Sequence, residues 1–368
     1  MAGAEDLISD FRRHVEVLGE RAPAYQSVLA RVADLLCDPR AGPLLTAAFA
    51  RSWSRRSFSS YYERPLLLLA SLRHDALLDG PAHPLWRAIG DVESDESAVT
   101  HEAVAQSLAP NRLGFWITLR TRRVQTNEVS RAVTWLWPAA LAGAADGRRP
   151  VSLVDVGASA GLNLVADRLP LHWSNQYGEK LATARGVRAT ARMGFDLRPL
   201  DVTDHDDLRW LRACIWPGER DRLELLDTAV AEFGNASPRA ELEILTASAV
   251  PARLELLSRD APPDGLVIAY QTLLDGYLRA SEREAYDLLM REWLARAPAG
   301  AALWLKLEMG DETEPIAPAR IHALLASGGR AEPLTLGQTG YHPREVIVDP
   351  NAARELKRLL GGGAWGSA

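Results

Sequence analysis

Residues 151–164 read VSLVDVGASAGLNL, and this stretch decides the fold of the chain. The apolar run at its start is typical of a buried strand, and it leads directly into a turn with glycines at Gly157 and Gly161. Two interpretations fit the turn. In one, Asp155 and Ser159 join the two glycines in the nucleotide-binding turn of a Rossmann-like sheet. In the other, G-x-S-x-G is the nucleophile elbow of an α/β-hydrolase, and Ser159 is the attacking group.

The sequence around this turn predicts an α/β fold. Before residue 150 the pattern is helical and punctuated by prolines, whereas after it strand and helix patterns alternate. The expected strands are 151–156, 191–195, 242–246, 265–270, 301–307, 331–336 and 344–348. The expected helices are 161–168, 205–213, 220–233, 250–259, 281–296 and 318–326. This alternation predicts a mostly parallel sheet covered by helices. Because no helix separates the last two strands, they should pair as an antiparallel hairpin at the sheet edge.

The same patterns suggest three regions. We expect residues 1–120 to form an all-helical cap that supplies much of a substrate pocket. Residues 121–360 would form the Rossmann-like ligand-binding domain, and residues 361–368, rich in glycine, a flexible tail.

Composition narrows the classes of function. A net charge of −6, from 42 basic and 48 acidic residues, gives no general attraction to nucleic acid or to an anionic membrane. Cys37 and Cys214 are far apart, which argues against a disulfide framework and against zinc, and the histidines show no metal-ligand spacing. The longest aliphatic run stops at Arg73, too short for a membrane span, and no signal peptide opens the chain. We therefore expect a cytoplasmic protein without a metal site.

The surroundings of the turn favour the nucleotide interpretation over the hydrolase. A hydrolase needs several strands and an oxyanion loop, often of His-Gly type, before its elbow, but the first 150 residues read as helical and contain no His-Gly pair. Its remaining partners would be Asp275 or Asp311 followed by His342. In the nucleotide interpretation Asp196 ends the second strand, where such folds bind the ribose hydroxyls. Asp196 follows Gly161 by more than the usual spacing, so an insert around residues 172–180 must account for the difference.

Four stretches carry a resemblance to a known family. They are Thr121-RRVQTNEVSR, Val154-DVGASAGLNL, Gly194-FDLRPLDVTD with Trp210-LRACIWP, and the Tyr341-His-Pro turn. Together they resemble class I S-adenosylmethionine (SAM)-dependent methyltransferases. More closely, they are similar to a bacterial domain-of-unknown-function family with a methyltransferase-like fold. The fold by itself does not supply an activity.

The resemblance implies SAM as cofactor and a set of residues that contact it. These are Gly157, Ser159 and Gly161 at the methionine part, Asp155 steadying the turn, Asp196 at the ribose, and Ser248 near the adenine in place of the usual third-strand acid.

A polar cluster precedes the first strand. We expect residues 125–128 to lie in an amphipathic helix that crosses the carboxyl ends of the strands, where ligands bind in such sheets. There, Gln125 or Asn127 would bond the amino acid end of SAM, and Arg122 or Arg123 would hold its carboxylate. Asn163, two residues past the turn, is similarly placed. Helix capping and surface ion pairing are the alternative roles for these side chains.

Catalysis from SAM is mostly a matter of alignment, because the sulfonium already activates the carbon that is transferred. Tyr177, Tyr270 and Trp135 are candidates for a cation–π contact with the sulfonium, with core packing as the alternative. His342 is the candidate general base.

The sequence therefore predicts a SAM-binding enzyme, in the first place a methyltransferase acting on a small molecule. Three alternatives stay open: an enzyme that consumes SAM without methylating, for example by cyclising it, a hydrolase with Ser159 as nucleophile, and a non-catalytic scaffold.

Overall fold

A computed structural model describes residues 3–58, 60–90, 93–310, 318–325 and 333–361. The chain divides into two compact units. Unit 1 comprises Met1–Thr126 and Asp201–Leu226, and unit 2 comprises Asn127–Leu200 and Asp227–Ala368. The sequence placed the first boundary at 120/121 and did not anticipate that a later segment belongs with the helical unit.

Unit 1 is helical, and its described residues contain no strand. Its helices are α1 (Ala4–Leu18), α2 (Pro23–Cys37), α3 (Ala41–Ser52), α4 (Glu63–Asp79), α5 (His101–Ser107), α6 (Leu113–Thr121), α8 (His205–Ala213) and the start of α9 (Arg220–Gly234). Leu7, Phe11 and Leu18 bury one face of α1, as helical spacing predicts. Helix α4 is buried from Leu67 to Ala76 and packs against α6 and α8. No helix in the described part of the chain is long and apolar enough to cross a membrane.

Charged contacts attach α8 to the rest of unit 1. Asp204 caps the helix by accepting hydrogen bonds from the main-chain N–H groups of Asp206 and Asp207. The carboxylates of these two residues both bind the guanidinium of Arg122. His74 on α4 lies with its Nε2 3.0 Å from Asp206 Oδ1. The segment 201–226 is therefore part of unit 1 through specific side-chain contacts as well as packing.

The described strands of unit 2 form one nine-stranded sheet, in the order β2-β9-β8-β7-β6-β5-β1-β3-β4. They are β1 (Pro150–Val156), β2 (Ser174–Asn175), β3 (Arg188–Asp196), β4 (Ala240–Ile244), β5 (Leu266–Thr272), β6 (Ala302–Glu308), β7 (Ala319–Leu325), β8 (Leu334–Thr339) and β9 (Glu345–Val348). Strands β1 and β3–β6 run parallel, and β6–β9 form an antiparallel succession. The mixed α/β class and the antiparallel pairing of β8 with β9 were predicted correctly. The predicted place of this pair at the sheet edge is wrong, because β2 pairs with β9 on its outer side.

The order of the strands reverses beside β1. From β1 the chain continues to β3 and β4 on one side, and then returns to β5 and β6 on the other. In open α/β sheets, ligands bind outside the carboxyl ends of the strands at such a reversal. The turn that follows β1 lies at this point.

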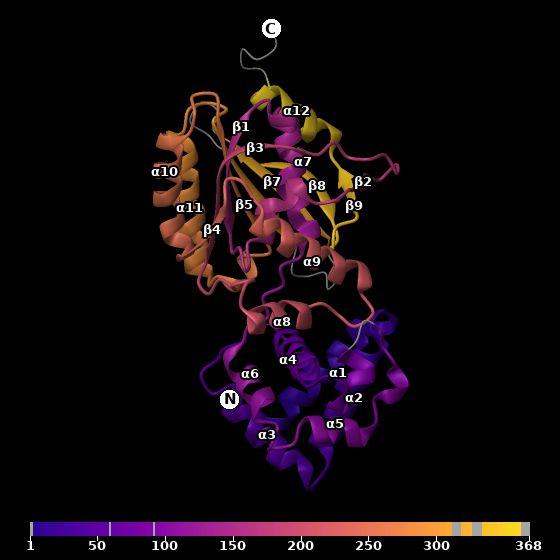
Figure 1. The fold of residues 1–368 in the computed structure, drawn as a ribbon. Helices are drawn as coiled ribbons and strands as arrows, with labels where there is room; N and C mark the ends of the chain where they lie inside the picture. The colour runs from indigo at the N-terminus through magenta and orange to yellow at the C-terminus, as the bar shows by residue number, and fades with distance from the viewer. Residues whose placement is uncertain (1–2, 59, 91–92, 311–317, 326–332, 362–368) are drawn as a thin grey trace. The chain divides into compact units, whose positions relative to one another are not determined.

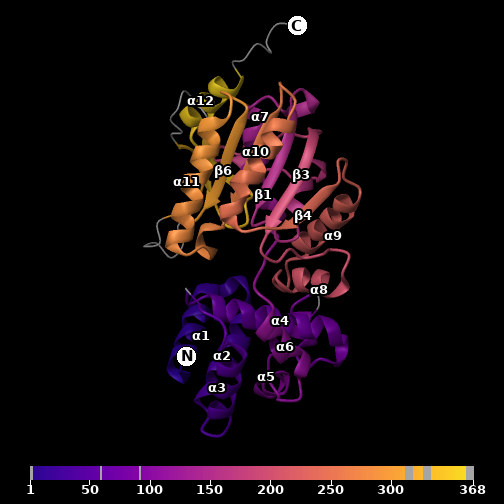
Figure 2. The ribbon, with the colours of Figure 1, turned by 90° about the vertical axis from the view of Figure 1, so that its left-hand side faces the viewer.

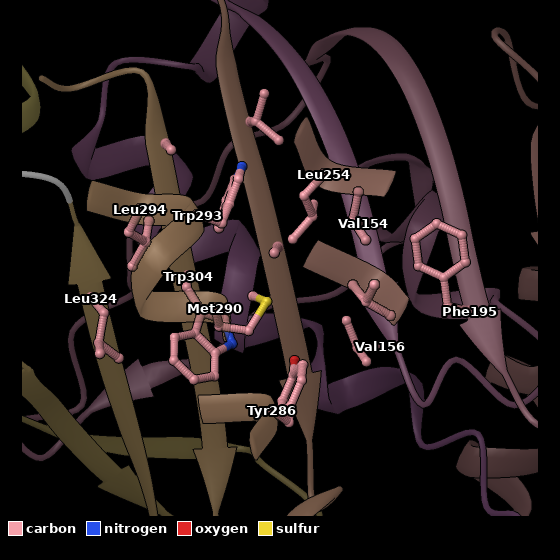
Figure 3. Close-up of a cluster of buried hydrophobic side chains, with 14 residues drawn as sticks. Val154, Val156, Phe195, Leu254, Tyr286, Met290, Trp293, Leu294, Trp304 and Leu324 are labelled. Carbon is pink, nitrogen blue, oxygen red and sulfur yellow. The ribbon is translucent and has the colours of Figure 1, made fainter. Parts of the chain in front are cut away.

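Helices cover both faces of the sheet (Figures 1 and 2). Helices α10 (Val250–Asp260) and α11 (Ala280–Arg296) lie on one face, and α7 (Val133–Leu141) and α12 (Pro350–Gly361) on the other. Figure 3 shows the core under α10 and α11, where Val154 and Val156 of β1 lie near Met290, Trp293 and Trp304. Burial of each such side chain contributes about 1.5–3 kcal/mol. This core fixes the strands whose ends carry the site.

The helix predicted over 318–326 is wrong. Residues Ala319–Leu325 form strand β7, antiparallel to β6. Ala319, Ile321 and Ala323 are buried while Arg320 is exposed, which is the alternation of a strand. The run Ile321 to Leu325 also fits helical spacing, so the periodicity was ambiguous there.

The helix expected through residues 125–128 is also wrong. Helix α6 ends at Thr121, and the next helical residues are the 3-10 turn η5 (Val129–Ala132). The intervening segment has neither helix nor strand. Residues 362–368 of the expected tail lie outside the described residues.

Candidate functional site

The turn 157–161 joins β1 to the 3-10 helix η7 (Leu162–Arg168). Three of its residues have positive φ: 80° at Gly157, 54° at Ser159 and 70° at Gly161. Glycine adopts this conformation freely, whereas at Ser159 it costs about 1–3 kcal/mol. The main-chain N–H groups of Gly157 and Ala158 both donate to the carbonyl of Phe195 on β3. The turn is thus held in a strained form by the neighbouring strand.

The two glycines also lie in a tightly packed place. A Cβ at Gly161 would lie 2.7 Å from Leu242 Cδ2, and one at Gly157 would lie 3.0 Å from Leu274 Cδ1. A side chain at either position would have to displace the end of a leucine side chain, Leu242 of β4 or Leu274 of the segment after β5.

Asp196 reaches the turn from the end of β3. Its Oδ2 accepts the main-chain N–H of Ser159 at 2.9 Å, and its Oδ1 accepts that of Arg198 at 2.8 Å. A carboxylate has about four acceptor positions, so both oxygens can accept further hydrogen bonds. The structure brings these two sequence-predicted residues, Ser159 and Asp196, into direct contact.

Asp155 and Tyr270 are buried side by side beneath the turn, at paired positions of β1 and β5. Burial raises the pKa of Asp155 to about 8; the phenol of Tyr270 opposes this and the charge of Asp196 adds to it. At neutral pH Asp155 therefore holds a proton. Tyr270 stacks on Trp135 of α7, with ring centroids 6.2 Å apart. Both aromatic rings are part of a packed layer under the site.

Asn163 follows the turn, and only 3% of it is exposed. Its side-chain oxygen has no hydrogen-bond partner among the described residues. Such a buried polar atom costs about 1–3 kcal/mol and calls for a bound water, ion or ligand. The main-chain carbonyl of Asn163 accepts the indole N–H of Trp135 at 3.0 Å, so its backbone is fixed.

A buried ion pair anchors η7, the helix that carries Asn163. Arg192 of β3 donates to both carboxylate oxygens of Asp167, at 2.7 and 2.9 Å. A two-bond contact of this kind fixes geometry well. Asn127 adds a further tie, because its Oδ1 accepts the main-chain N–H of Leu162 at 2.9 Å.

His342 follows β8 and lies at the same end of the sheet as the carboxyl ends of the parallel strands. Strand β8 runs in the same direction as β6, because each is antiparallel to β7. His342 Nδ1 lies 2.8 Å from Oε2 of the buried Glu128, whose Oε1 accepts the Ser130 hydroxyl at 2.7 Å. The buried carboxylate fixes the ring, and the half-exposed imidazole keeps Nε2 for another partner.

Other predicted residues lie elsewhere. Tyr177 follows β2, which runs opposite to β6, so it lies toward the amino ends of the main strands and is 79% exposed. Gln125 belongs to unit 1, as does Arg122, which binds two aspartates there. Ser248 follows β4 and is exposed, with its hydroxyl 3.2 Å from that of Thr246.

Sequence reasoning missed a buried polar group at the ends of β5 and β6. Gln271 Nε2 donates to Glu308 Oε1 at 2.6 Å and to Asp275 Oδ1 at 2.8 Å. Gln271 and Glu308 each come at the end of a predicted buried strand, and this position was the signal that could have found them. Asp311 lies outside the described residues. Among the residues described, no cluster of three or more His, Cys, Asp or Glu side chains is placed to hold a metal ion.

Unit 2 is therefore an open, mostly parallel α/β sheet with a polar site at the carboxyl ends of β1, β3, β5 and β6. A family model described as "Uncharacterized protein conserved in bacteria (DUF2332)" matches residues 9–347. The chain belongs to this family, which confirms that part of the resemblance. A search of curated proteins gave no match.

Proposed function

We propose that unit 2 binds SAM at the turn 157–161 and that the protein is a SAM-dependent methyltransferase for a small molecule. The observation that carries the proposal is Asn163, a buried amide whose oxygen has no partner among the described residues, two positions beyond a turn with three positive φ values. The strand order supports it, because β4-β3-β1-β5-β6 is the doubly wound order 3-2-1-4-5 of nucleotide-binding sheets.

The residues present fit the parts of SAM. The ammonium group of its amino acid end is a donor that would complete the bonding of the Asn163 oxygen. Asp196 has acceptor positions left for ribose hydroxyls. Leu197 and Ile244 follow at neighbouring strand ends and are 60% and 72% exposed, so they offer an apolar surface to the purine ring.

The residues also fit the chemistry. SAM supplies an activated methyl group, and the protein's main task is to align the acceptor with it. Where the acceptor loses a proton, His342 is placed to take it at Nε2, because Glu128 engages Nδ1. The buried pair Asp155 and Tyr270 supports the turn from below, and Asp155 in its neutral form avoids a second negative charge beside Asp196.

The hydrolase finds one supporting observation, the positive φ of Ser159 after a strand. However, a nucleophile elbow exposes the serine hydroxyl above the sheet, and Ser159 is only 6% exposed. A 3-10 helix also replaces the helix that would follow an elbow. Ser159→Ala separates the two functions, since it would abolish ester hydrolysis but only weaken SAM binding.

Calorimetric titration with SAM and with its demethylated product tests the proposal. We expect both to bind the full chain, and Asn163→Leu to weaken both by tenfold or more. Absence of binding of either at millimolar concentration would overturn the proposal and leave the scaffold alternative. Incubation with SAM alone, followed by product analysis, shows whether SAM is cyclised without an acceptor.

A further inference from the structure

The segment after β5 is held in place by a carboxylate on the next strand. The main-chain N–H groups of Leu274 and Asp275 donate to the two oxygens of Glu308, at 3.1 and 3.2 Å. Gln271 donates to the same carboxylate at 2.6 Å. Glu308 is nearly fully buried at the end of β6. Its carboxylate thus accepts three hydrogen bonds from residues 271–275.

This segment, the loop 273–277, is strained and touches the glycine turn. Leu273 has φ 57°, which a leucine adopts only under constraint. Its main-chain N–H donates to the carbonyl of Leu307 at 2.7 Å. Leu274 packs beside Gly157, so that a Cβ added at Gly157 would lie 3.0 Å from Leu274 Cδ1. The hydrogen bonds to Glu308 therefore keep a strained loop against the candidate SAM site.

We infer that Glu308 is a positioning residue of the candidate site: its ionised carboxylate holds the loop 273–277 against Gly157, and protonation of this carboxylate loosens the loop. A protonated carboxyl is a weaker acceptor than a carboxylate and gains an O–H that needs a partner of its own, so its bonds to the three N–H donors weaken. Strain at Leu273 then favours rearrangement. The effect on the ligand rests on the proposed function, whereas the motion of the loop does not.

The surroundings of Glu308 support a proton change near neutral pH. Burial raises its pKa to about 7, with the charge of Asp275 adding to this and Gln271 and Lys306 opposing it. The charged and titratable groups around it are Asp275, Lys306 on β6, Tyr286 and Asp287 on α11, and Arg320 and His322 on β7. Burial lowers the pKa of His322 below its usual range, and burial raises that of Tyr286 well above 10, so both stay neutral from pH 7 to 8.

Amide hydrogen exchange of the ligand-free full chain tests the inference. After correction for intrinsic rates, we expect a peptide covering 272–278 to exchange about fivefold or more faster at pH 6 than at pH 8. In Glu308→Gln the peptide should exchange fast at both values, because the amide offers one acceptor oxygen. Glu243→Gln on β4, at the far edge of the sheet, is the matched control. It should keep the wild-type change in exchange rate between pH 6 and pH 8, which we call the pH step.

Lys306→Met provides a second variant in case Glu308→Gln does not fold. Loss of the nearby positive charge should move the pH step upward. A wild-type peptide without a step, or a Glu308→Gln variant that keeps it, overturns the inference. SAM affinity should follow the same step in the wild type; failure of SAM to bind at any pH would refute the proposed function and leave the exchange result standing.

Discussion

The polar groups at the two ends of the parallel strands in unit 2 differ in how completely they are hydrogen-bonded. At the amino ends, Arg149 donates to five main-chain carbonyls, with distances from 2.6 to 3.5 Å: those of Ala142, Asp264, Gly265, Gly300 and Leu360. One side chain thus ties the starts of β1, β5 and β6 to the end of α12. At the carboxyl ends, the Asn163 oxygen lacks a partner among the described residues, Ser159 and Leu273 have strained backbones, and Asp155 is a buried acid with a raised pKa.

The amino ends of the strands therefore contribute to the stability of the fold, whereas the carboxyl ends contain groups that reduce it. Hydrogen-bonded carbonyls of this kind are what folding alone would select. Buried polar atoms without partners and strained residues persist where a ligand or a reaction uses them. The comparison makes four predictions, from the largest effect to the smallest.

Removal of Arg149 should break the amino end. We expect Arg149→Ala to lower the free energy of unfolding by about 3 kcal/mol, because several carbonyls lose their donor at once. Denaturant unfolding followed by circular dichroism measures it. Arg148→Ala is the control: the exposed Arg148 side chain pairs with the equally exposed Asp146, so its loss should cost less than about 0.5 kcal/mol. Equal effects of the two variants would remove the distinction between the ends.

Neutralising Asp155 should stabilise the carboxyl end. Its folded pKa, about 8, lies above the unfolded value of 3.8, so the folded state holds the proton while the unfolded state loses it. Stability from this group is therefore full at low pH and is lost as pH rises through that interval. We expect Asp155→Asn to gain stability progressively relative to the wild type as the pH rises from 5 to 8. A variant less stable than the wild type at every pH from 5 to 8.5 would show that the carboxylate is ionised and needed.

An asparagine at each end gives a matched pair. Asn163→Leu removes no hydrogen bond of its side-chain oxygen, so stability should change by less than about 1 kcal/mol while SAM affinity falls. Asn175 near the amino ends accepts the N–H groups of Tyr177 and Glu179, so Asn175→Leu should cost about 1 kcal/mol and leave SAM affinity unchanged. The comparison is contradicted if Asn175→Leu weakens SAM binding while Asn163→Leu lowers only the stability.

Tyr177 should have the smallest effect. Because it is exposed and lies toward the amino ends, Tyr177→Ala should change stability by less than about 0.5 kcal/mol and leave SAM binding unchanged. Binding weakened tenfold would restore its predicted role at the sulfonium.

Local pattern predicted much of this sheet. Apolar runs located β1, β5 and β6 within a residue or two, because buried strands leave a clear signal. Strand β7 was missed because Ile321, Leu324 and Leu325 satisfy both periods, and only pairing with β6 decides between them. Propensity cannot settle such a segment without its neighbour.

Long-range contacts set the limit for the site. The glycine turn and Asp196 could be predicted because each directly follows a strand. The contact between Glu128 and His342 could not, since it joins residues 214 apart and depends on the direction of β8. The position of Tyr177 depends likewise on β2 running against β6, which its own sequence does not encode.

The return of residues 201–226 to the helical unit has a consequence for synthesis. A ribosome releases α4 and Arg122 long before Asp206 and Asp207, the carboxylates that bind this arginine. Helices α1–α6 therefore lack their packing partner α8 until the first three strands of the sheet have been synthesised. A fragment ending at residue 126 should expose the side of α4 that α8 covers and aggregate, whereas one ending after α9 has the whole helical unit.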